Sequence, residues 1–193
     1  MKQVVVIAGP SGSGKNAVIG SILKRNRKFT RLVTVTTRAM RPGEQEGVDY
    51  HFLSQEKFDA ELGAGNIPEH RFVPELNTYY GIYLPDLKEK IQAGKIVFAQ
   101  VDIEGVRLLK ERFGAVAIFI MPESLEQFKS RVRVRNPEWS QKEFDARMRI
   151  TEEEMRVHAP QYDYRVTNAD GKLQETVSQV MDIMHKEGYT FES

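Results

Sequence analysis

The sequence predicts an α/β fold in which a parallel sheet is flanked by helices. One observation is the opening of the chain, where a β-branched run over 4–7 is followed by a glycine-rich turn and then by a helical pattern of apolar residues. A second is that later apolar runs over 96–101, 115–121 and 165–167 are separated by helical segments. Buried strands that alternate with helices are typical of a doubly wound sheet.

The length and composition limit the kind of protein. A chain of 193 residues with 40% hydrophobic residues can form one domain with a substantial core. The 28 lysine and arginine residues nearly balance the 27 acidic ones, and the net charge of +1 argues against a basic nucleic-acid binder or an acidic disordered tail. Because the chain has no cysteine, disulfide scaffolds, cysteine-rich zinc sites and thiol nucleophiles are excluded.

The apolar run near the N-terminus does not have the features of a membrane or export segment. It ends at Gly9-Pro10, so it is too short to span a bilayer, and it lacks the apolar length of a signal peptide. We therefore expect a soluble, cytoplasmic protein without a membrane or nucleic-acid partner. The sequence gives no indication of the oligomeric state.

The expected elements follow in order along the chain. A helix is predicted over 15–25, where apolar residues recur at helical spacing. A second helix is predicted over 85–93, because Pro85 suits a first helical turn and Gly94 follows the last turn. The other elements expected are a strand over 31–37, a polar loop over 39–49 and a short strand over 50–53.

Two segments do not fit the simple alternation of strands and helices. Residues 34–84 are rich in loop and strand patterns, and residues 122–156 are strongly charged and helical. Both are interpreted as insertions on a core made of 1–33, 85–121 and 157–193. The sequence thus predicts one domain with an inserted mixed α/β region and a helical arm.

The glycine-rich turn matches the pattern G-x-x-x-x-G-K of a phosphate loop. Small residues let successive backbone N–H groups surround a phosphate, while the next helix directs its positive end at the anion and Lys15 reaches the outer phosphates. A turn that only packs the helix on the sheet is the alternative, but the buried strand before it and the helix after it favour phosphate binding. The loop consists of Gly9, Pro10, Ser11, Gly12, Ser13, Gly14 and Lys15.

A metal ligand is expected directly after this loop. The usual serine or threonine hydroxyl that binds Mg²⁺ is replaced by Asn16, and Ala17 follows. The carbonyl oxygen of Asn16 is a weak ligand, so we expect Mg²⁺ to be held mainly by nucleotide phosphates and water, with Asn16 acting through water. Asp102 follows a buried strand and should face the same crevice, although an ordinary exposed strand-end acid is the alternative.

A longer run makes the interpretation more specific. The segment TVTTRAMRPGEQEGVDYHF over 34–52 resembles the S-x-T-T-R-x-P-R-x-G-E-x-x-G-x-D-Y-x-F run of the guanylate kinase family. The resemblance covers nearly the whole chain. It continues through Pro68-Glu69-His70, Tyr79-Tyr80-Gly81, Val101-Asp102-Ile103-Glu104-Gly105, Phe119-Ile120-Met121-Pro122, Arg131, Arg135, Arg147, Asp163-Tyr164 and Asn168.

The resemblance implies an enzyme that transfers the γ-phosphoryl group of ATP to GMP, or to dGMP, with Mg²⁺. The core would bind ATP, region 34–84 would bind GMP, and region 122–156 would be a lid. The implied ATP contacts are the phosphate loop, Asn16, Ala17 and, near the base, Asn168. The implied GMP contacts are Arg38, Arg41, Tyr50 and Tyr80 at the phosphate, and Thr34, Glu69 and Asp102 at guanine. The implied catalytic residues are Lys15, Arg131, Arg135 and Arg147.

The chemistry of these residue types agrees with such roles. Guanine presents N1–H and N2–H₂ donors on one edge, and an ionised carboxylate such as Glu69 only accepts hydrogen bonds. Arginine guanidinium groups with tyrosine hydroxyls match a monophosphate, and transfer needs aligned positive charge but no general base. Several residues depart from the family pattern, and they gather around the base: Met40, Ile82, Gln100, Glu104 and a lengthened segment over 71–78 that includes Pro74.

Three other interpretations stay open. The chain could be a kinase of another phosphate acceptor, either a ribose bisphosphate or a different nucleoside monophosphate, although Glu69 would then have no guanine to read. It could also be a catalytically silent guanylate-kinase-like binding module, although the phosphate loop argues against this. The charged arginines over 122–156 could simply form a solvated helix face.

Overall fold

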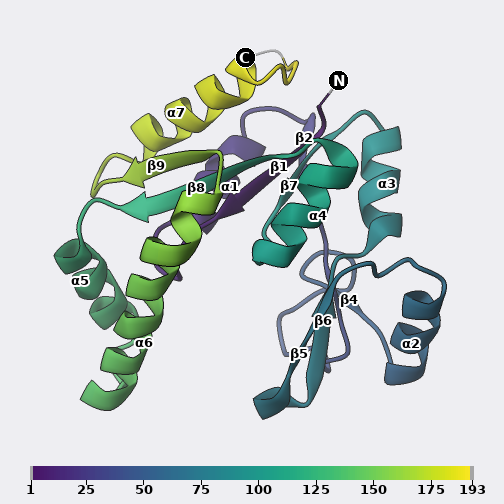
Figure 1. The fold of residues 1–193 in the computed structure, drawn as a ribbon, viewed down its shortest axis with the longest axis horizontal. Helices are drawn as coiled ribbons and strands as arrows, with labels where there is room; N and C mark the ends of the chain where they lie inside the picture. Colours follow the sequence, from purple (N-terminus) through teal and green to yellow (C-terminus); the bar gives the residue numbers. More distant parts are fainter. Residues whose placement is uncertain (1, 192–193) are drawn as a thin grey trace.

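The computed structural model describes residues 2–191 and confirms an α/β fold with a parallel central sheet. Its five strands lie in the order β2-β7-β1-β8-β9, and every neighbouring pair is parallel. The order reverses direction around β1, so the carboxyl end of β1 lies at the switch point where such sheets bind ligands (Figure 1). The strands are β1 (Val4–Ala8), β2 (Phe29–Arg31), β7 (Ile96–Ala99), β8 (Val116–Pro122) and β9 (Tyr164–Asn168).

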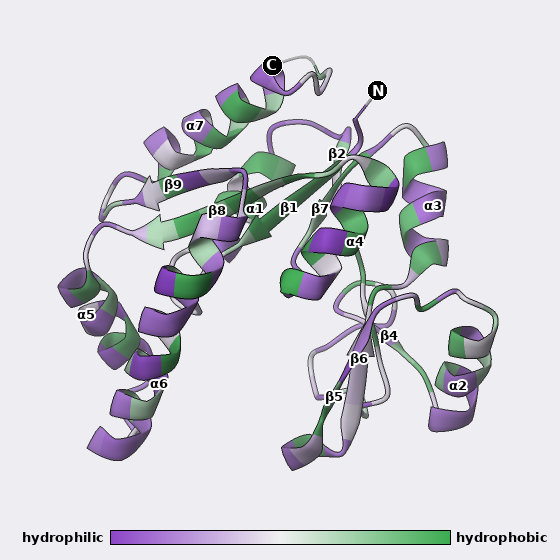
Figure 2. Cartoon of the chain, in the orientation of Figure 1, coloured by the Kyte–Doolittle hydropathy of each residue, from purple (hydrophilic) through white to green (hydrophobic). Residues whose placement is uncertain are grey.

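Helices cover both faces of this sheet, which explains its continuous apolar strands. Val5 and Ile7 face one core cluster, while Val4, Val6 and Ala8 face another, as expected from the period of two along a strand. Figure 2 shows the hydrophobic colour on β1, β7 and most of β8. One face is covered by α1 (Lys15–Leu23) and α7 (Leu173–Lys186), and the other by α3 (Leu84–Gln92) and α4 (Ile103–Phe113).

A second, smaller sheet occupies the inserted region. Its strand order is β4-β3-β6-β5, with β3 parallel to β4 and antiparallel to β6. Helix α2 (Gln55–Gly63) packs Phe58 on this sheet beside Val35 and Ile67. The sequence interpretation missed α2, although Ser54 caps its N-terminus by accepting from the Lys57 N–H. The strands are β3 (Val35–Thr36), β4 (His51–Phe52), β5 (His70–Val73) and β6 (Thr78–Gly81).

The expected single strand over 31–37 is wrong. The chain leaves the first sheet after β2 and enters the second at β3, so residues 32–34 connect the two sheets. Leu32 joins the core of the first sheet and Val35 joins that of the second. An alternating pattern indicates which residues are buried but not which sheet buries them. The pattern over 31–37 therefore did not show that the chain passes from one sheet to the other.

The other expected elements are present with shifted ends. The predicted helices over 15–25 and 85–93 correspond to α1 and α3, and the short strand over 50–53 corresponds to β4. The apolar runs become β7, β8 and β9 as expected. Among residues 2–191, no helix has the length and apolar character needed to cross a membrane.

The charged segment forms a helical arm, which consists of α5 (Leu125–Arg135) and α6 (Gln141–Glu153). Its two helices pack around a small core of Phe128, Val132, Phe144 and Met148. Ser140 and Glu143 form a capping box that starts α6. A π-helical turn over Glu154–His158 and a 3₁₀ turn over Ala159–Gln161 then return the chain to the main sheet. Figure 1 shows the arm and the second sheet projecting from the same end of the central sheet.

Asp86 on α3 holds the crossing between the sheets. Its carboxylate accepts a hydrogen bond of 3.0 Å from the Val33 N–H and lies 3.1 Å from Nε2 of His51 in β4. Lys90 Nζ lies 2.6 Å from the same carboxylate and also donates to the Arg31 carbonyl at 2.7 Å. One buried carboxylate therefore fixes both sides of the connecting segment relative to the core.

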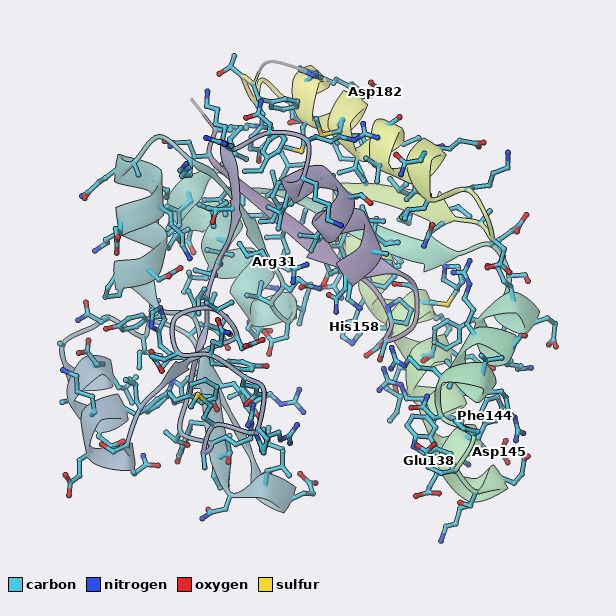
Figure 3. All side chains as sticks on the ribbon, turned by 180° about the vertical axis from the view of Figure 1, so that it is seen from behind. Arg31, Glu138, Phe144, Asp145, His158 and Asp182 are labelled. Carbon is cyan, nitrogen blue, oxygen red and sulfur yellow. The ribbon has the colours of Figure 1, made fainter. Side chains whose placement is uncertain are left out.

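We predict that Asp86→Ala destabilises the protein by about 3 kcal/mol, because it leaves a buried N–H and a partly buried ammonium without their acceptor. Urea unfolding checks this value. The matched control is Asp182→Ala on the exposed face of α7 (Figure 3), which should change the free energy of unfolding by no more than about 0.5 kcal/mol. Equal unfolding midpoints for the two variants would contradict the role of Asp86.

Candidate functional site

The predicted phosphate loop lies between β1 and α1, at the carboxyl edge of the sheet. Gly9 has φ +138°, and a Cβ there would stand 2.2 Å from the Ile120 carbonyl oxygen. Gly14 has φ +93°, and a Cβ there would meet Nδ2 of Asn168 at 2.1 Å. The loop therefore requires glycine at both positions, because larger residues would push it away from β8 and β9.

Lys15 folds back over the loop. Its ammonium donates to the carbonyls of Gly9 and Pro10, the latter at 2.9 Å. Burial lowers the pKa of Lys15 to about 8, with Glu154 opposing this change and Arg147 and Arg135 adding to it. An anion that enters the loop would therefore stabilise the charged form of Lys15.

The arginines of the arm occupy different positions. Arg135 donates to Ser11 Oγ in the loop at 2.9 Å, and both Arg135 and Arg147 act electrostatically on Lys15. Arg131 instead pairs with Asp170 and donates to the Asn168 carbonyl at 3.1 Å. The structure thus brings Arg135 and Arg147 towards the loop, while Arg131 lies beside the end of β9.

Two asparagines at the loop have defined partners. Asn168 donates from Nδ2 to the Ser13 carbonyl at 2.8 Å and accepts from the Thr176 hydroxyl at 3.1 Å. Its amide therefore holds the backbone of the loop. Asn16 accepts at Oδ1 from Gln100 Nε2 at 3.0 Å. Ala17 follows it and is exposed.

The donor set near the loop fits Mg²⁺ only if phosphates and water supply most of the ligands. Within residues 2–191, no group of three or more histidine, cysteine, aspartate or glutamate residues could hold a metal ion. The oxygens at hand are the Asn16 carbonyl, the buried Ser13 hydroxyl, which has no hydrogen-bond partner, and the Asp102 carboxylate. These are hard oxygen donors, which Mg²⁺ accepts around a shell that keeps several waters.

A cleft of ≈ 610 Å³ adjoins the loop. Residues of the loop, the end of β7, the second sheet and the π-helical turn contribute to it. Its lining comprises Ile7, Ala8, Gly9, Lys15, Arg71, Gln100, Val101, Asp102, Ile103, Glu104, Phe119, Glu154, His158 and Tyr162.

The sequence interpretation missed Glu154 and His158. Oε2 of Glu154 and Nδ1 of His158 are buried without a hydrogen-bond partner, and both residues line this cleft. Figure 3 shows His158 where the arm joins the main sheet, away from Glu138 and Asp145 at the arm's tip. Their spacing of four residues was the available signal, but it did not distinguish them from the other charged residues of the arm.

A second cavity of ≈ 240 Å³ continues from the first, and the two share Arg71, Gln100, Val101 and Asp102. Most of the residues expected to contact an acceptor nucleotide line it, although they come from both sheets. These are Thr34, Tyr50, Glu69, Tyr80 and Asp102. The predicted constellation is therefore brought together in space, except for its two arginines.

Arg38 lies beside Tyr50, which lines this cavity. Both of its terminal nitrogens pair with Glu44, at 2.8 and 3.0 Å, and its guanidinium carbon lies 5.5 Å from the centre of the Tyr50 ring. The Tyr50 and Tyr80 rings are 5.7 Å apart. Nε of Arg38 is buried without a partner. Arg41 is exposed, and its backbone contacts Glu44: the Arg41 N–H donates to the Glu44 carboxylate and the Arg41 carbonyl accepts from the Glu44 N–H.

The wall around Glu69 is strongly acidic. Burial, together with the charges of Asp102 and Glu104, raises the pKa of Glu69 to about 7. Ile82, which departs from the family pattern, is fully buried and forms an apolar part of the lining. The lengthened segment over 71–78 is the hairpin of β5 and β6, with a 3₁₀ turn that starts at Pro74.

Comparisons of the sequence agree on one family. A family model described as guanylate kinase matches residues 1–187. The chain is 33% identical to a guanylate kinase of Prochlorococcus marinus over 95% of this chain and 97% of that protein. It is 38% identical to a guanylate kinase of Idiomarina loihiensis over 87% of this chain and 80% of that protein.

A comparison of folds gives the same result. The crystal structure of guanylate kinase from Anaplasma phagocytophilum superposes with a TM-score of 0.67 at 27% sequence identity. The match covers 98% of this chain and 88% of that chain. Both sheets and the helical arm therefore fall within the region of similarity.

The raised pKa of Glu69 predicts how stability depends on pH. Its carboxyl keeps a proton to about pH 7 in the folded state, whereas the unfolded group loses it near its ordinary pKa of 4.5. Its contribution to stability is therefore fully present below pH 4.5 and is lost as the pH rises to about 7. Glu69→Gln should remove this loss and raise Tm at pH 8 by roughly a few degrees relative to the parent protein.

The check is thermal unfolding of both proteins between pH 4 and pH 8. Glu75→Gln, on the exposed 3₁₀ turn, is the matched control and should leave the pH dependence unchanged. A Tm difference between Glu69→Gln and the parent that stays constant across this range would show that Glu69 titrates normally.

Proposed function

The chain belongs to the guanylate kinase family, and from this premise we propose how its cleft transfers the γ-phosphoryl group of ATP to GMP. The chain is an ATP-dependent kinase that converts GMP to GDP and releases ADP. The observation that carries the assignment of roles is the pair of adjoining cavities, one beside the phosphate loop and one with an acidic wall.

We assign the phosphate groups of ATP to the loop Gly9–Lys15. The backbone N–H groups of its small residues would surround the β-phosphate, and the positive end of α1 would face the same charge. Lys15 would exchange its contacts with the loop carbonyls for the outer phosphates, and its pKa would rise when the anion binds. Asn168 would support this site by holding the Ser13 carbonyl, and Ala17 would lie at its edge.

Mg²⁺ is the cofactor that these residues fit. Asn16, linked to Gln100, would hold the ion weakly through a water molecule, together with the Ser13 hydroxyl. When bound, the ion supplies positive charge to the phosphate oxygens and keeps them in a fixed orientation. Mg²⁺ could bind here although Asn16 has no hydroxyl group, because phosphate oxygens and water molecules would complete its coordination shell.

We assign the smaller cavity to GMP. An ionised Glu69 would accept from the N1–H and N2–H₂ donors of guanine, supported by Asp102 and Thr34. The phosphate of GMP would lie by the Tyr50 and Tyr80 hydroxyls and the unpartnered Nε of Arg38. Arg41 is exposed and would have to turn inward to join them. The same pocket would admit dGMP, since none of these contacts reads the 2′ position.

The transfer itself needs alignment and charge. An oxygen of the GMP phosphate forms the new bond to the γ-phosphorus as the bond to the oxygen bridging the β- and γ-phosphates breaks, and ADP leaves with that oxygen. The acceptor is already ionised, so no residue must remove a proton. Lys15, Arg135 and Arg147 would neutralise the charge that develops, and Arg131 would join them if it leaves Asp170.

The regions of the chain then have distinct proposed roles. The core of 1–33, 85–121 and 157–193 would bind ATP, 34–84 would bind GMP, and 122–156 would close as a lid that excludes water. Exclusion of water matters because ATP would otherwise be hydrolysed without transfer. The cytoplasmic location and the absence of a nucleic-acid partner stay predictions from the sequence.

A panel of nucleoside monophosphates with ATP and Mg²⁺ tests the assignment. ADP release should be stimulated far more by GMP than by AMP, CMP or UMP, because only guanine offers two donors to Glu69. Equal stimulation by AMP would contradict the guanine assignment, and no turnover with any monophosphate would favour a silent binding module.

Two variants refine this test. Lys15→Met should lower kcat by at least about 100-fold, as expected for loss of a charge at the transferred group. Lys88→Met, on the exposed face of α3, is the matched control and should retain full activity.

Glu69→Ala should abolish the preference for GMP. If the protein were instead a kinase of ribose bisphosphate, the same substitution would leave its activity largely unchanged.

A further inference from the structure

Arg71 on β5 lies where the two cavities meet, and it lines both of them. We infer that Arg71 binds the O6 and N7 acceptors of guanine and so determines specificity together with Glu69. The inference rests on the proposed binding of GMP in the smaller cavity. Arg71 belongs to none of the contacts that the family resemblance implied.

The backbone places Arg71 and Glu69 side by side. Glu69 lies in the bend just before β5, Arg71 is the second residue of β5, and both line the smaller cavity. In the neighbouring strand, Tyr80 stands opposite Arg71 in register, and the Ile82 N–H bonds to the Glu69 carbonyl. These residues therefore form one continuous wall of the cavity.

The guanidinium of Arg71 has its donors available. Arg71 is exposed, and its side chain makes no hydrogen bond or ion pair with any of the residues that the structure describes. It is also the one cation that the described residues contribute to the lining of the smaller cavity, against the acids Glu69 and Asp102.

Guanine needs donors next to the edge that Glu69 accepts. Its O6 and N7 are adjacent acceptors, and the planar fork of arginine matches that pair with two hydrogen bonds. Other candidates are less suitable, because Ile82 has no donor and Gln100 already donates to Asn16. The Glu69 carboxylate and the Arg71 guanidinium would thus bind the two neighbouring edges of guanine. Adenine would be rejected twice, since it offers a donor at position 6 and an acceptor at N1.

The geometry favours the base over the phosphate as the partner of Arg71. Arg71 shares both cavities with Asp102, which the proposed function places at guanine. Arg38 and Arg41, which are assigned to the phosphate, line neither cavity in the described part of the chain. The cation at the phosphate and the cation at the base would therefore be different residues.

The test asks whether Arg71 contacts N7 of guanine. GMP and 7-deaza-GMP, in which carbon replaces N7, are compared as substrates of the parent protein and of Arg71→Ala. The parent should prefer GMP by kcat/KM, and the preference should lie between about 10- and 150-fold, as for one hydrogen bond from a charged donor. Arg71→Ala should raise KM for GMP and use both nucleotides equally well.

Arg165→Ala is the matched control, because Arg165 is an exposed strand arginine that lines neither cavity. It should preserve the preference for GMP. If Arg71→Ala weakens GMP and 7-deaza-GMP by the same factor, Arg71 acts on the phosphate, and the inference is overturned. An unchanged kcat/KM for GMP in Arg71→Ala overturns it as well.

Failure of the proposed function would look different. In that case the parent protein would phosphorylate neither nucleotide, whereas the inference about Arg71 concerns only the ratio between them. Calorimetric titration of the two nucleotides measures that ratio independently of turnover. A ratio near one for the parent protein overturns the inference, and a ratio that falls to one only in Arg71→Ala supports it.

Discussion

The close approach of the phosphate loop to the ends of β8 and β9 is the constraint on which the remaining structure depends. Gly9 lies against the Ile120 carbonyl and Gly14 against the Asn168 amide, with no room for a side chain at either position. This contact fixes the direction of α1 and the place of Lys15 at the switch point of the sheet. The arm that follows β8 and the second sheet that follows β2 then project around that point.

Charge separates the two halves of the cleft. Near the loop, burial lowers the pKa of Lys15, and the charges of Arg147 and Arg135 lower it as well. Near the second sheet, burial raises the pKa of Glu69, and the charges of Asp102 and Glu104 act in the same direction. Both groups of like charges destabilise the folded protein when no ligand is bound. Groups with such perturbed pKa values are typical of binding sites, where a ligand removes the repulsion. Phosphates would relieve the first, and hydrogen-bond donors of a base would relieve the second.

The sequence predicted what local physics determines and missed what long-range packing decides. The phosphate loop was predictable, because a glycine pattern between a buried strand and a helix has few other uses. The constellation around Glu69 followed from the family resemblance, and the cavity collects most of it. The crossing at residues 32–34 depends on Asp86, which is distant in sequence. Arg71, Glu154 and His158 became visible only once both sheets and the arm were in place.

The central claim is that one chain holds two nucleotides end to end, with the acceptor base against the acidic wall. The most direct measurement is a crystal structure with GMP and an ATP analogue that cannot transfer its γ-phosphoryl group. The account predicts the analogue's phosphates within the loop 9–15 and the N1–H and N2–H₂ groups of guanine in hydrogen-bond contact with the Glu69 carboxylate. Guanine bound away from Glu69, or phosphates bound outside the loop, would contradict it.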